Sequence, residues 1–242
     1  MLDYNAFELV DHAVSLEYRV LALTLHGCIY YPEELRKYAQ SKGILLIPGI
    51  ELYLDRREVL LLGNCFHDVA SLRTLHDLRA LKKLHGEDLL VIAPHPFYGL
   101  PQCLGKQLEK YADVFDAVEF CHFYTSWWNP NRRAEEVAHR INKPMIACSD
   151  THQLKWMGHH YHLVDAKQTK EDVFTAIRAG RIRNVSRPLS NKEFAKKTFW
   201  HIAIADPRKL ACKWGWIQRM PSKRCRKGKG GINKTVPSAM LH

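Results

Sequence analysis

Short, fully apolar segments recur along the chain and alternate with stretches that have the periodicity of amphipathic helices. Strands that are apolar on both faces are typical of a parallel sheet whose outer face is covered by helices. The repeated strand–helix units favour a closed or nearly closed α/β barrel over an open sheet. The predicted strands are residues 19–24, 44–47, 59–62, 89–93, 116–120 and 145–148, and the predicted helices include residues 5–16, 68–85 and 132–141.

The positive charge of the chain is concentrated near its C-terminus. The formal net charge is +11, and ten Lys or Arg but no acidic residue lie in residues 207–242. We therefore predict a barrel domain over residues 1–190, a C-terminal helix over residues 191–206 and a basic, flexible tail over residues 207–242. The composition of the tail fits both contact with nucleic-acid phosphates and a solvated extension, and the sequence leaves both open.

Several classes of protein are disfavoured by the composition. No apolar run has the length of a membrane span, and the first residues lack the basic and apolar regions of a secretory signal. The seven cysteines are scattered and form no C-x-x-C pair, which is typical of free thiols in a reducing compartment. We expect a cytoplasmic protein without a membrane partner.

Several predicted strands run into residues of the types that bind metal ions. In a parallel barrel all strand C-termini lie at one mouth, so these residues should converge there. The recurrence of the pattern at strand after strand distinguishes it from isolated polar residues. The remaining histidines are interpreted mainly as surface residues, which leaves the group around His160 open. The six candidate metal ligands are His26, Glu51, His95, His122, Asp150 and His152, and Glu119 precedes His122 on the same strand.

The pair Asp150 and His152 illustrates the reasoning. In extended backbone, residues two apart point to the same side, so the carboxylate and the imidazole could hold one ion. Oxygen and imidazole ligands without thiolates suit zinc, manganese or iron, and spacing does not choose among them. Such a centre polarises a phosphoryl oxygen and lowers the pKa of bound water so that hydroxide can attack.

These segments resemble the PHP (polymerase and histidinol phosphatase) family of metal-dependent phosphoesterases. The resemblance implies a distorted (β/α)7-type barrel that binds one to three divalent ions and hydrolyses phosphate esters. By the family pattern, Glu51 bridges two metals, one of which also binds His95 and His122. Asp150 would bind the second, and His26 and His152 a third. The matching segments are Leu23-Thr24-Leu25-His26, Pro48-Gly49-Ile50-Glu51, Ala93-Pro94-His95-Pro96, Glu119-Phe120-Cys121-His122 and Ser149-Asp150-Thr151-His152.

The chain departs from the family pattern at two places. The first family motif, His-x-His at the end of the first strand, is absent, and Leu25 stands where the second motif has an acid. We interpret the first departure as a missing first strand, which would reduce activity. The leading hypothesis is a phosphoesterase that uses metal-bound hydroxide on a small phosphorylated substrate. The alternatives are a non-catalytic PHP-like scaffold or RNA-binding protein, similar to a ribonuclease P subunit, and a polymerase proofreading module.

Overall fold

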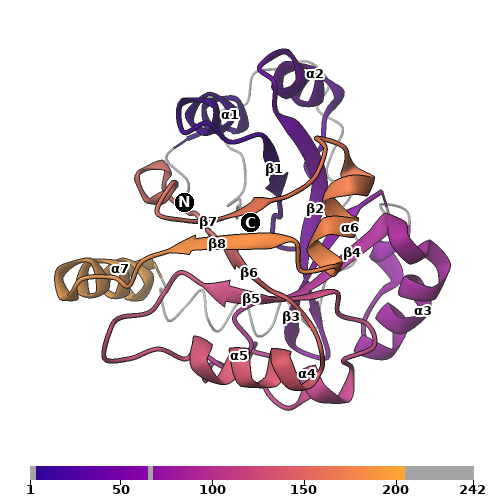
Figure 1. Cartoon of the computed structure of the whole chain (residues 1–242), viewed down its shortest axis with the longest axis vertical. Helices are drawn as coiled ribbons and strands as arrows, with labels where there is room; N and C mark the ends of the chain where they lie inside the picture. The colour runs from indigo at the N-terminus through magenta and orange to yellow at the C-terminus, as the bar shows by residue number, and fades with distance from the viewer. Residues whose placement is uncertain (1–3, 65–67, 205–242) are drawn as a thin grey trace.

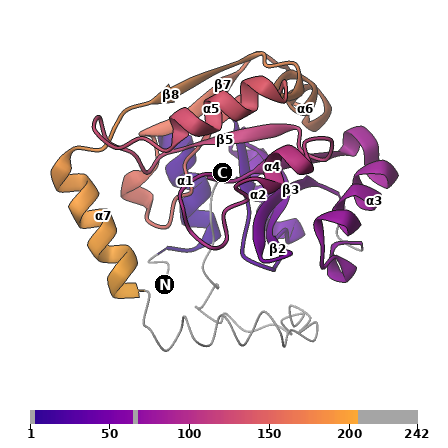
Figure 2. The same ribbon diagram turned by 90° about the horizontal axis from the view of Figure 1, so that it is seen from below.

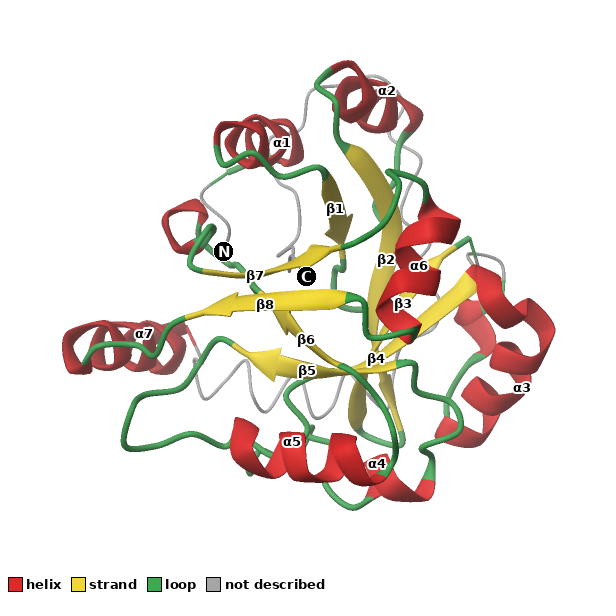
Figure 3. Cartoon of the chain, in the orientation of Figure 1, coloured by secondary structure: helices red, strands yellow, loops and turns green. Residues whose placement is uncertain are grey.

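The structure, a computed structural model, describes residues 4–64 and 68–204. Its centre is a six-stranded mixed sheet that curls into a half-barrel, with a second, two-stranded sheet beside it (Figures 1 and 3). The predicted tail over residues 207–242 lies outside the described residues. In spatial order the strands of the half-barrel are β1 (Val20–Leu23), β2 (Leu45–Leu54), β3 (Arg57–Gly63), β4 (Leu89–Ala93), β5 (Ala117–Cys121) and β6 (Met145–Cys148), and the second sheet pairs β7 (His160–Val164) with β8 (Ile182–Ser186).

Helices surround the curled sheet on several sides (Figure 2). Within residues 4–64 and 68–204, no helix is both long enough and apolar enough to cross a membrane. The described cysteines, Cys28, Cys103, Cys121 and Cys148, are free thiols, as predicted for them. The helices are α1 (Ala6–Ser15), α2 (Glu33–Ser41), α3 (Leu75–His85), α4 (Gln107–Lys110), α5 (Asn131–Arg140), α6 (Lys170–Arg178) and α7 (Asn191–Ile204), with 3₁₀ turns at Val69–Ser71, Gly86–Asp88 and Leu154–Trp156.

The start of α3 differs from the predicted start. Asp68 begins only the 3₁₀ turn Val69–Ser71, and its side chain makes no cap hydrogen bond there. The helix itself begins after Thr74, whose hydroxyl accepts from the Asp77 N–H while the Asp77 carboxylate accepts from the Thr74 N–H. This reciprocal capping box satisfies two N-terminal donors at once, which sets the start of the helix.

One strand runs against the predicted parallel direction. The pairs β1–β2, β4–β5 and β5–β6 are parallel, whereas β3 is antiparallel to both β2 and β4. Leu54 pairs with Arg57, so Asp55 and Arg56 alone form the turn, with φ of 50° and 65°. Positive φ at both turn residues is the geometry of a type I′ hairpin, whose twist matches that of the strands. The all-parallel prediction is therefore wrong at β3.

Both faces of the half-barrel are apolar, which explains the continuous apolar strands. Leu61 and Val91 pack in a core cluster that includes residues of α3 and α5. Their neighbours on the opposite face, such as Leu60 and Ile92, pack in a cluster with Phe174 of α6. A third cluster lies between β1 and the helices α1 and α2. Side chains alternate between two cores along each strand.

The edge of β6 is covered by side chains of the second sheet. The Asn184 side chain on β8 accepts from the Ala147 N–H at 2.8 Å and donates to the Met145 carbonyl at 2.8 Å. His162 on β7 lies 2.8 Å from the Ala147 carbonyl oxygen. These contacts occupy backbone groups that would otherwise form an open sheet edge.

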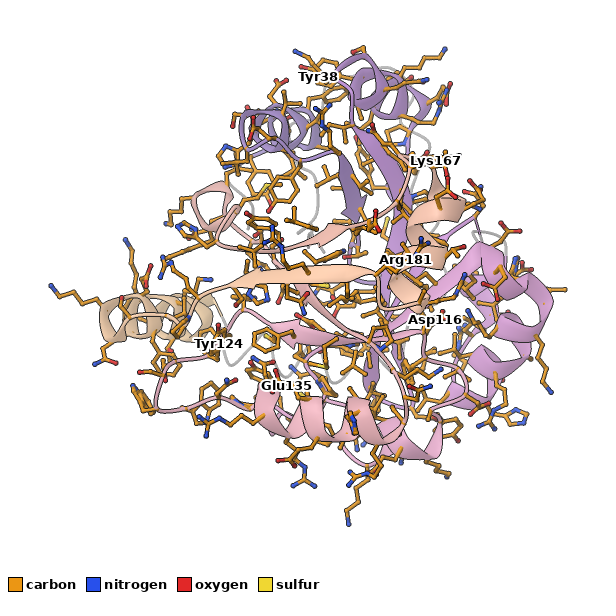
Figure 4. All side chains as sticks on the ribbon, in the orientation of Figure 1. Tyr38, Asp116, Tyr124, Glu135, Lys167 and Arg181 are labelled. Atoms are coloured by element: carbon orange, nitrogen blue, oxygen red, sulfur yellow. The ribbon has the colours of Figure 1, made fainter. Side chains whose placement is uncertain are left out.

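A charged cluster connects the sheet and helices at the start of β5. Figure 4 labels Asp116, which accepts from the Val91 N–H at 2.8 Å, from Lys82 Nζ at 2.6 Å and from Arg178 Nε at 3.0 Å. Lys82 belongs to α3 and Arg178 to α6, so one buried carboxylate joins two helices to two strands.

Candidate metal centre

The inner face of the half-barrel changes from apolar to polar along its strands. On β2, Ile47 belongs to the inner apolar cluster and Glu51 follows four residues later on the same face. On β5, Glu119 follows Ala117 by two residues and lies on the same face. On the antiparallel strand β3 the order is reversed, and Glu58 precedes the apolar Leu60. Three carboxylates therefore reach the same end of the sheet.

His26 is positioned beside Glu51 by the backbone. The two residues form an isolated parallel bridge, in which the Glu51 N–H donates to the Leu25 carbonyl and the Gly27 N–H donates to the Glu51 carbonyl. His26 Nδ1 lies 3.1 Å from Glu51 Oε2. Leu25 stands where the second motif of the PHP family has an acidic residue. Its side chain is buried in the core cluster with residues of α1 and α2.

Glu58 completes a three-residue group with His26 and Glu51. One ligand-type atom from each of the three lies within 4.8 Å of the other two. The Tyr53 hydroxyl, across the hairpin, donates to Glu58 Oε1, and the Tyr53 ring stacks on the His26 ring with centroids 5.8 Å apart. Tyr53 thus holds two of these side chains in place.

His95 extends the group toward β5. His95 Nε2 lies 3.4 Å from Glu58 Oε2, its backbone N–H donates to Glu119 Oε2 at 2.7 Å, and its Nδ1 lies 3.7 Å from Cys103 Sγ. The φ angle of His95 is 26°, a backbone conformation that residues other than glycine rarely adopt. Such strain is characteristic of functional sites, where surrounding contacts impose it.

Asp150 and His152 follow β6, but the backbone between them is not extended as we assumed. Asp150 has a φ of 38°. His152 Nδ1 nevertheless lies 3.6 Å from Asp150 Oδ1, so the two side chains do come together. Asp150 is close enough to Glu51 and Glu119 to raise the pKa of both carboxyl groups.

His122 belongs to a neighbouring part of the site. It is buried, and its ring makes edge contacts with the rings of Phe123 and His160. It lines a small hollow together with Ser149, the residue before Asp150. His160 is itself buried, with its ring nitrogens 2.6 Å from Ser186 Oγ and 2.5 Å from the Phe120 carbonyl oxygen. It is therefore not a surface residue, which the sequence had left open.

The buried carboxylates repel one another. Burial raises the pKa of Glu51 well above its usual value, and the nearby Glu58, Asp150 and Glu119 raise it further. Burial also raises the pKa of Glu119 to about 7, against the opposing effect of His95. For His95, burial lowers the pKa, but the Cys103 contact and the charges of Glu119, Glu58 and Glu51 leave it well above the usual value. The cluster therefore attracts positive charge.

The donor set fits a divalent cation. Glu51 is 0% exposed, and within the described part of the chain neither of its carboxylate oxygens accepts a hydrogen bond. Oε1 of the buried Glu119 likewise has no donor there. A buried carboxylate without donors is unfavourable unless a cation compensates it. Carboxylate oxygens together with imidazole nitrogens suit zinc, manganese and iron.

Glu58 is the residue that the sequence analysis missed. We looked for ligand types only at the C-terminal ends of strands, which is the correct end in a parallel sheet. Because β3 is antiparallel, its inner polar residue stands at the strand start. The short spacing between Glu51 and Glu58, with four consecutive charged residues (55–58) between two apolar segments, could have indicated a hairpin.

Comparison with known proteins agrees with this architecture. A family profile described as PHP-associated matches residues 128–182, and no curated protein matches the sequence significantly. A two-domain protein from Bacteroides vulgatus that contains a predicted PHP-like metal-dependent phosphoesterase is similar in structure, with a TM-score of 0.60 and 16% identity. The match covers 80% of this chain but only 64% of that protein.

A second solved structure has a similar fold. PsfC from Pseudomonas syringae PB-5123 has a TM-score of 0.55 and 15% identity, with 81% of this chain and 88% of that chain covered. At these identities the two structures show a common fold. The PHP-associated profile matches only residues 128–182, and the two solved structures show that this chain shares their fold.

Proposed function

We propose that this chain is a metal-dependent phosphoesterase that hydrolyses a small phosphate ester at the mouth of the half-barrel. The observation that carries the proposal is Glu51, a fully buried carboxylate without hydrogen-bond donors among the described residues. It lies between His26 and the other carboxylates of the inner face. This arrangement is unfavourable in an empty site and favourable around a cation.

The proposed ligands lie on either side of Glu51. His26, Glu51 and Glu58 would hold one ion, and the contact between Glu58 and His95 extends the set toward a second. Asp150, His152 and His122 are proposed as further ligands on the side of β6. A bound divalent metal polarises a phosphoryl oxygen and lowers the pKa of a water molecule. Whether zinc, manganese or iron serves, the chemistry is the same.

Other residues of the chain orient this set. The Tyr53 hydroxyl donates to Glu58 and fixes the rotation of its carboxylate. The His95 N–H holds Glu119, and Cys103 Sγ lies beside His95 Nδ1, so that His95 Nε2 is directed toward Glu58. Such outer contacts keep ligands in the geometry that a metal requires.

The test is the metal content of the purified chain and its Glu51→Gln variant, measured by elemental analysis, with hydrolysis of a small aryl phosphate as the second readout. We expect bound zinc, manganese or iron in the wild type and its loss, together with activity, in the variant. Glu135→Gln, an identical change at an exposed position of α5, is the control. A wild-type chain that binds no metal and hydrolyses no phosphate ester would refute the proposal and favour a non-catalytic scaffold.

A further inference from the structure

A buried lysine lies beside the candidate metal centre on the C-terminal helix. Lys197 of α7 is only 9% exposed, and Nζ stands 4.5 Å from the centroid of the Trp156 ring. Among the described residues, no carboxylate or carbonyl oxygen forms a hydrogen bond or an ion pair with it. Lysine is almost never this buried without a partner, because removing an ammonium from water is costly.

The hollow that Lys197 lines has a positive wall and adjoins the metal centre. The residues that line it include Arg187 and the candidate ligand His122, and none of them is acidic. Ser149, which precedes Asp150 in the sequence, also lines the hollow. Asp150 is close enough to influence the pKa of Lys197. The hollow has room for about one water molecule, which is also about the size of a single phosphate oxygen.

Two other polar side chains of the hollow, Arg187 and His160, already have partners. Both terminal nitrogens of Arg187 donate to the Glu193 carboxylate, at 2.6 and 2.9 Å. Both ring nitrogens of His160 contact Ser186 or the Phe120 carbonyl. Among the described residues, Lys197 is therefore a cation on this wall that makes no ion pair and could bind an anion.

The position of Lys197 is fixed by well-packed surroundings. At the start of α7, Ser190 and Glu193 form a reciprocal cap, and Glu193 also binds Arg187. The Phe194 ring contacts the Phe123 ring at 5.0 Å and the Trp128 ring at 5.8 Å. α7 is thus anchored one turn before Lys197, and the Trp156 ring supports the ammonium through a cation–π contact. Burial lowers the pKa of Lys197 to about 8, with Asp150 opposing, so the ammonium form predominates at neutral pH.

We infer that Lys197 is a substrate-binding residue whose ammonium contacts a phosphate oxygen that enters this hollow. The inference rests on the proposed function, because it places the phosphate ester next to the metal centre. A phosphate dianion that approaches a cluster of carboxylates needs a positive group besides the metal. A charge-assisted hydrogen bond from Lys197 would provide it and would orient the ester.

The test is calorimetric titration of the purified chain with orthophosphate, with metal content measured on the same samples. Lys197→Met keeps the methylene chain on Trp156 and removes the charge. It should weaken orthophosphate binding by about ten- to a hundredfold, the usual effect of losing a hydrogen bond to a charged group. Metal content should stay unchanged. Lys196→Met, at an exposed position of the same helix, removes the same charge and should leave the affinity unchanged.

A second measurement uses the wild type and does not depend on how a variant folds. Orthophosphate at saturation should protect Lys197, but not Lys196, from acetylation by acetic anhydride, as read by mass spectrometry. Equal orthophosphate affinities of wild type and Lys197→Met, or equal acetylation of Lys197 with and without orthophosphate, would overturn the inference. A metal-free wild type that still binds orthophosphate through Lys197 would refute the proposed function, and with it the substrate role of Lys197, while showing that the anion site itself exists.

Discussion

Glu119→Gln should stabilise the metal-free protein at neutral pH and have little effect in acid. Burial raises the pKa of Glu119 from 4.5 to about 7. The folded protein therefore holds this proton more tightly than the unfolded chain does. The associated stability is fully present below pH 4.5 and is lost as the pH rises through 7. Because each tenfold change in proton affinity corresponds to about 1.4 kcal/mol, the loss amounts to about 3 kcal/mol.

Glutamine removes this penalty without removing the principal contact. Its side-chain oxygen can still accept from the His95 N–H, as Glu119 Oε2 does at 2.7 Å. The assay is urea unfolding in the presence of a chelator. Between about pH 5 and about pH 8, the variant should gain roughly 2 kcal/mol relative to the wild type. Glu135→Gln, on the exposed face of α5, should show no such gain.

The comparison with metal provides a further check. A bound divalent ion would neutralise the cluster, so saturating zinc or manganese should abolish the advantage of the variant at about pH 8. If the difference in unfolding free energy between variant and wild type is the same at both pH values, Glu119 is not the strained carboxylate that the geometry indicates.

Two further predictions concern Glu58 and Asp116. Glu58→Gln should lower metal affinity by at least about tenfold, because even the residues that hydrogen-bond to metal ligands contribute that much. Competition with a chelating dye measures the affinity, and an unchanged value would show that Glu58 is not a ligand. Asp116→Ala should destabilise the fold by about 3–5 kcal/mol, since it leaves the Lys82 and Arg178 charges without their carboxylate. Urea unfolding measures the change in stability, and a decrease below about 1 kcal/mol would show that solvent screens the cluster.

Apolarity located the strands but did not determine their direction. The predicted segments 89–93 and 145–148 coincide with β4 and β6, and the others overlap β1, β2, β3 and β5. The direction of β3 depends on the turn at Asp55 and Arg56, which adopt positive φ without the Asn-Gly or Asp-Gly sequence typical of such hairpins. The turn therefore lacked the usual glycine signal, and only the run of charged residues between two apolar segments indicated it.

The same turn determined which site residues could be predicted. Glu51 was predicted as a ligand by reading each strand toward its C-terminus, and the same reading noted Glu119 on β5 without including it among the six candidate ligands. Glu58 stands where an antiparallel strand begins, so reading each strand toward its C-terminus could not find it. Lys197 is even less visible, because a lysine on an amphipathic helix is usually solvated and only the packing of α7 shows its burial.

The two residues missed by sequence reasoning complement each other in charge. Glu58 adds a carboxylate to a cluster that already contains Glu51, Glu119 and Asp150, which strengthens its attraction for divalent ions. The same negative charge would repel a phosphate ester that approaches along the strands. Lys197 belongs to a helix outside the half-barrel, and its side chain lines the same hollow as His122 and Ser149. On this view, the strands hold the metal, and α7 supplies the positive charge that lets a phosphate group approach it.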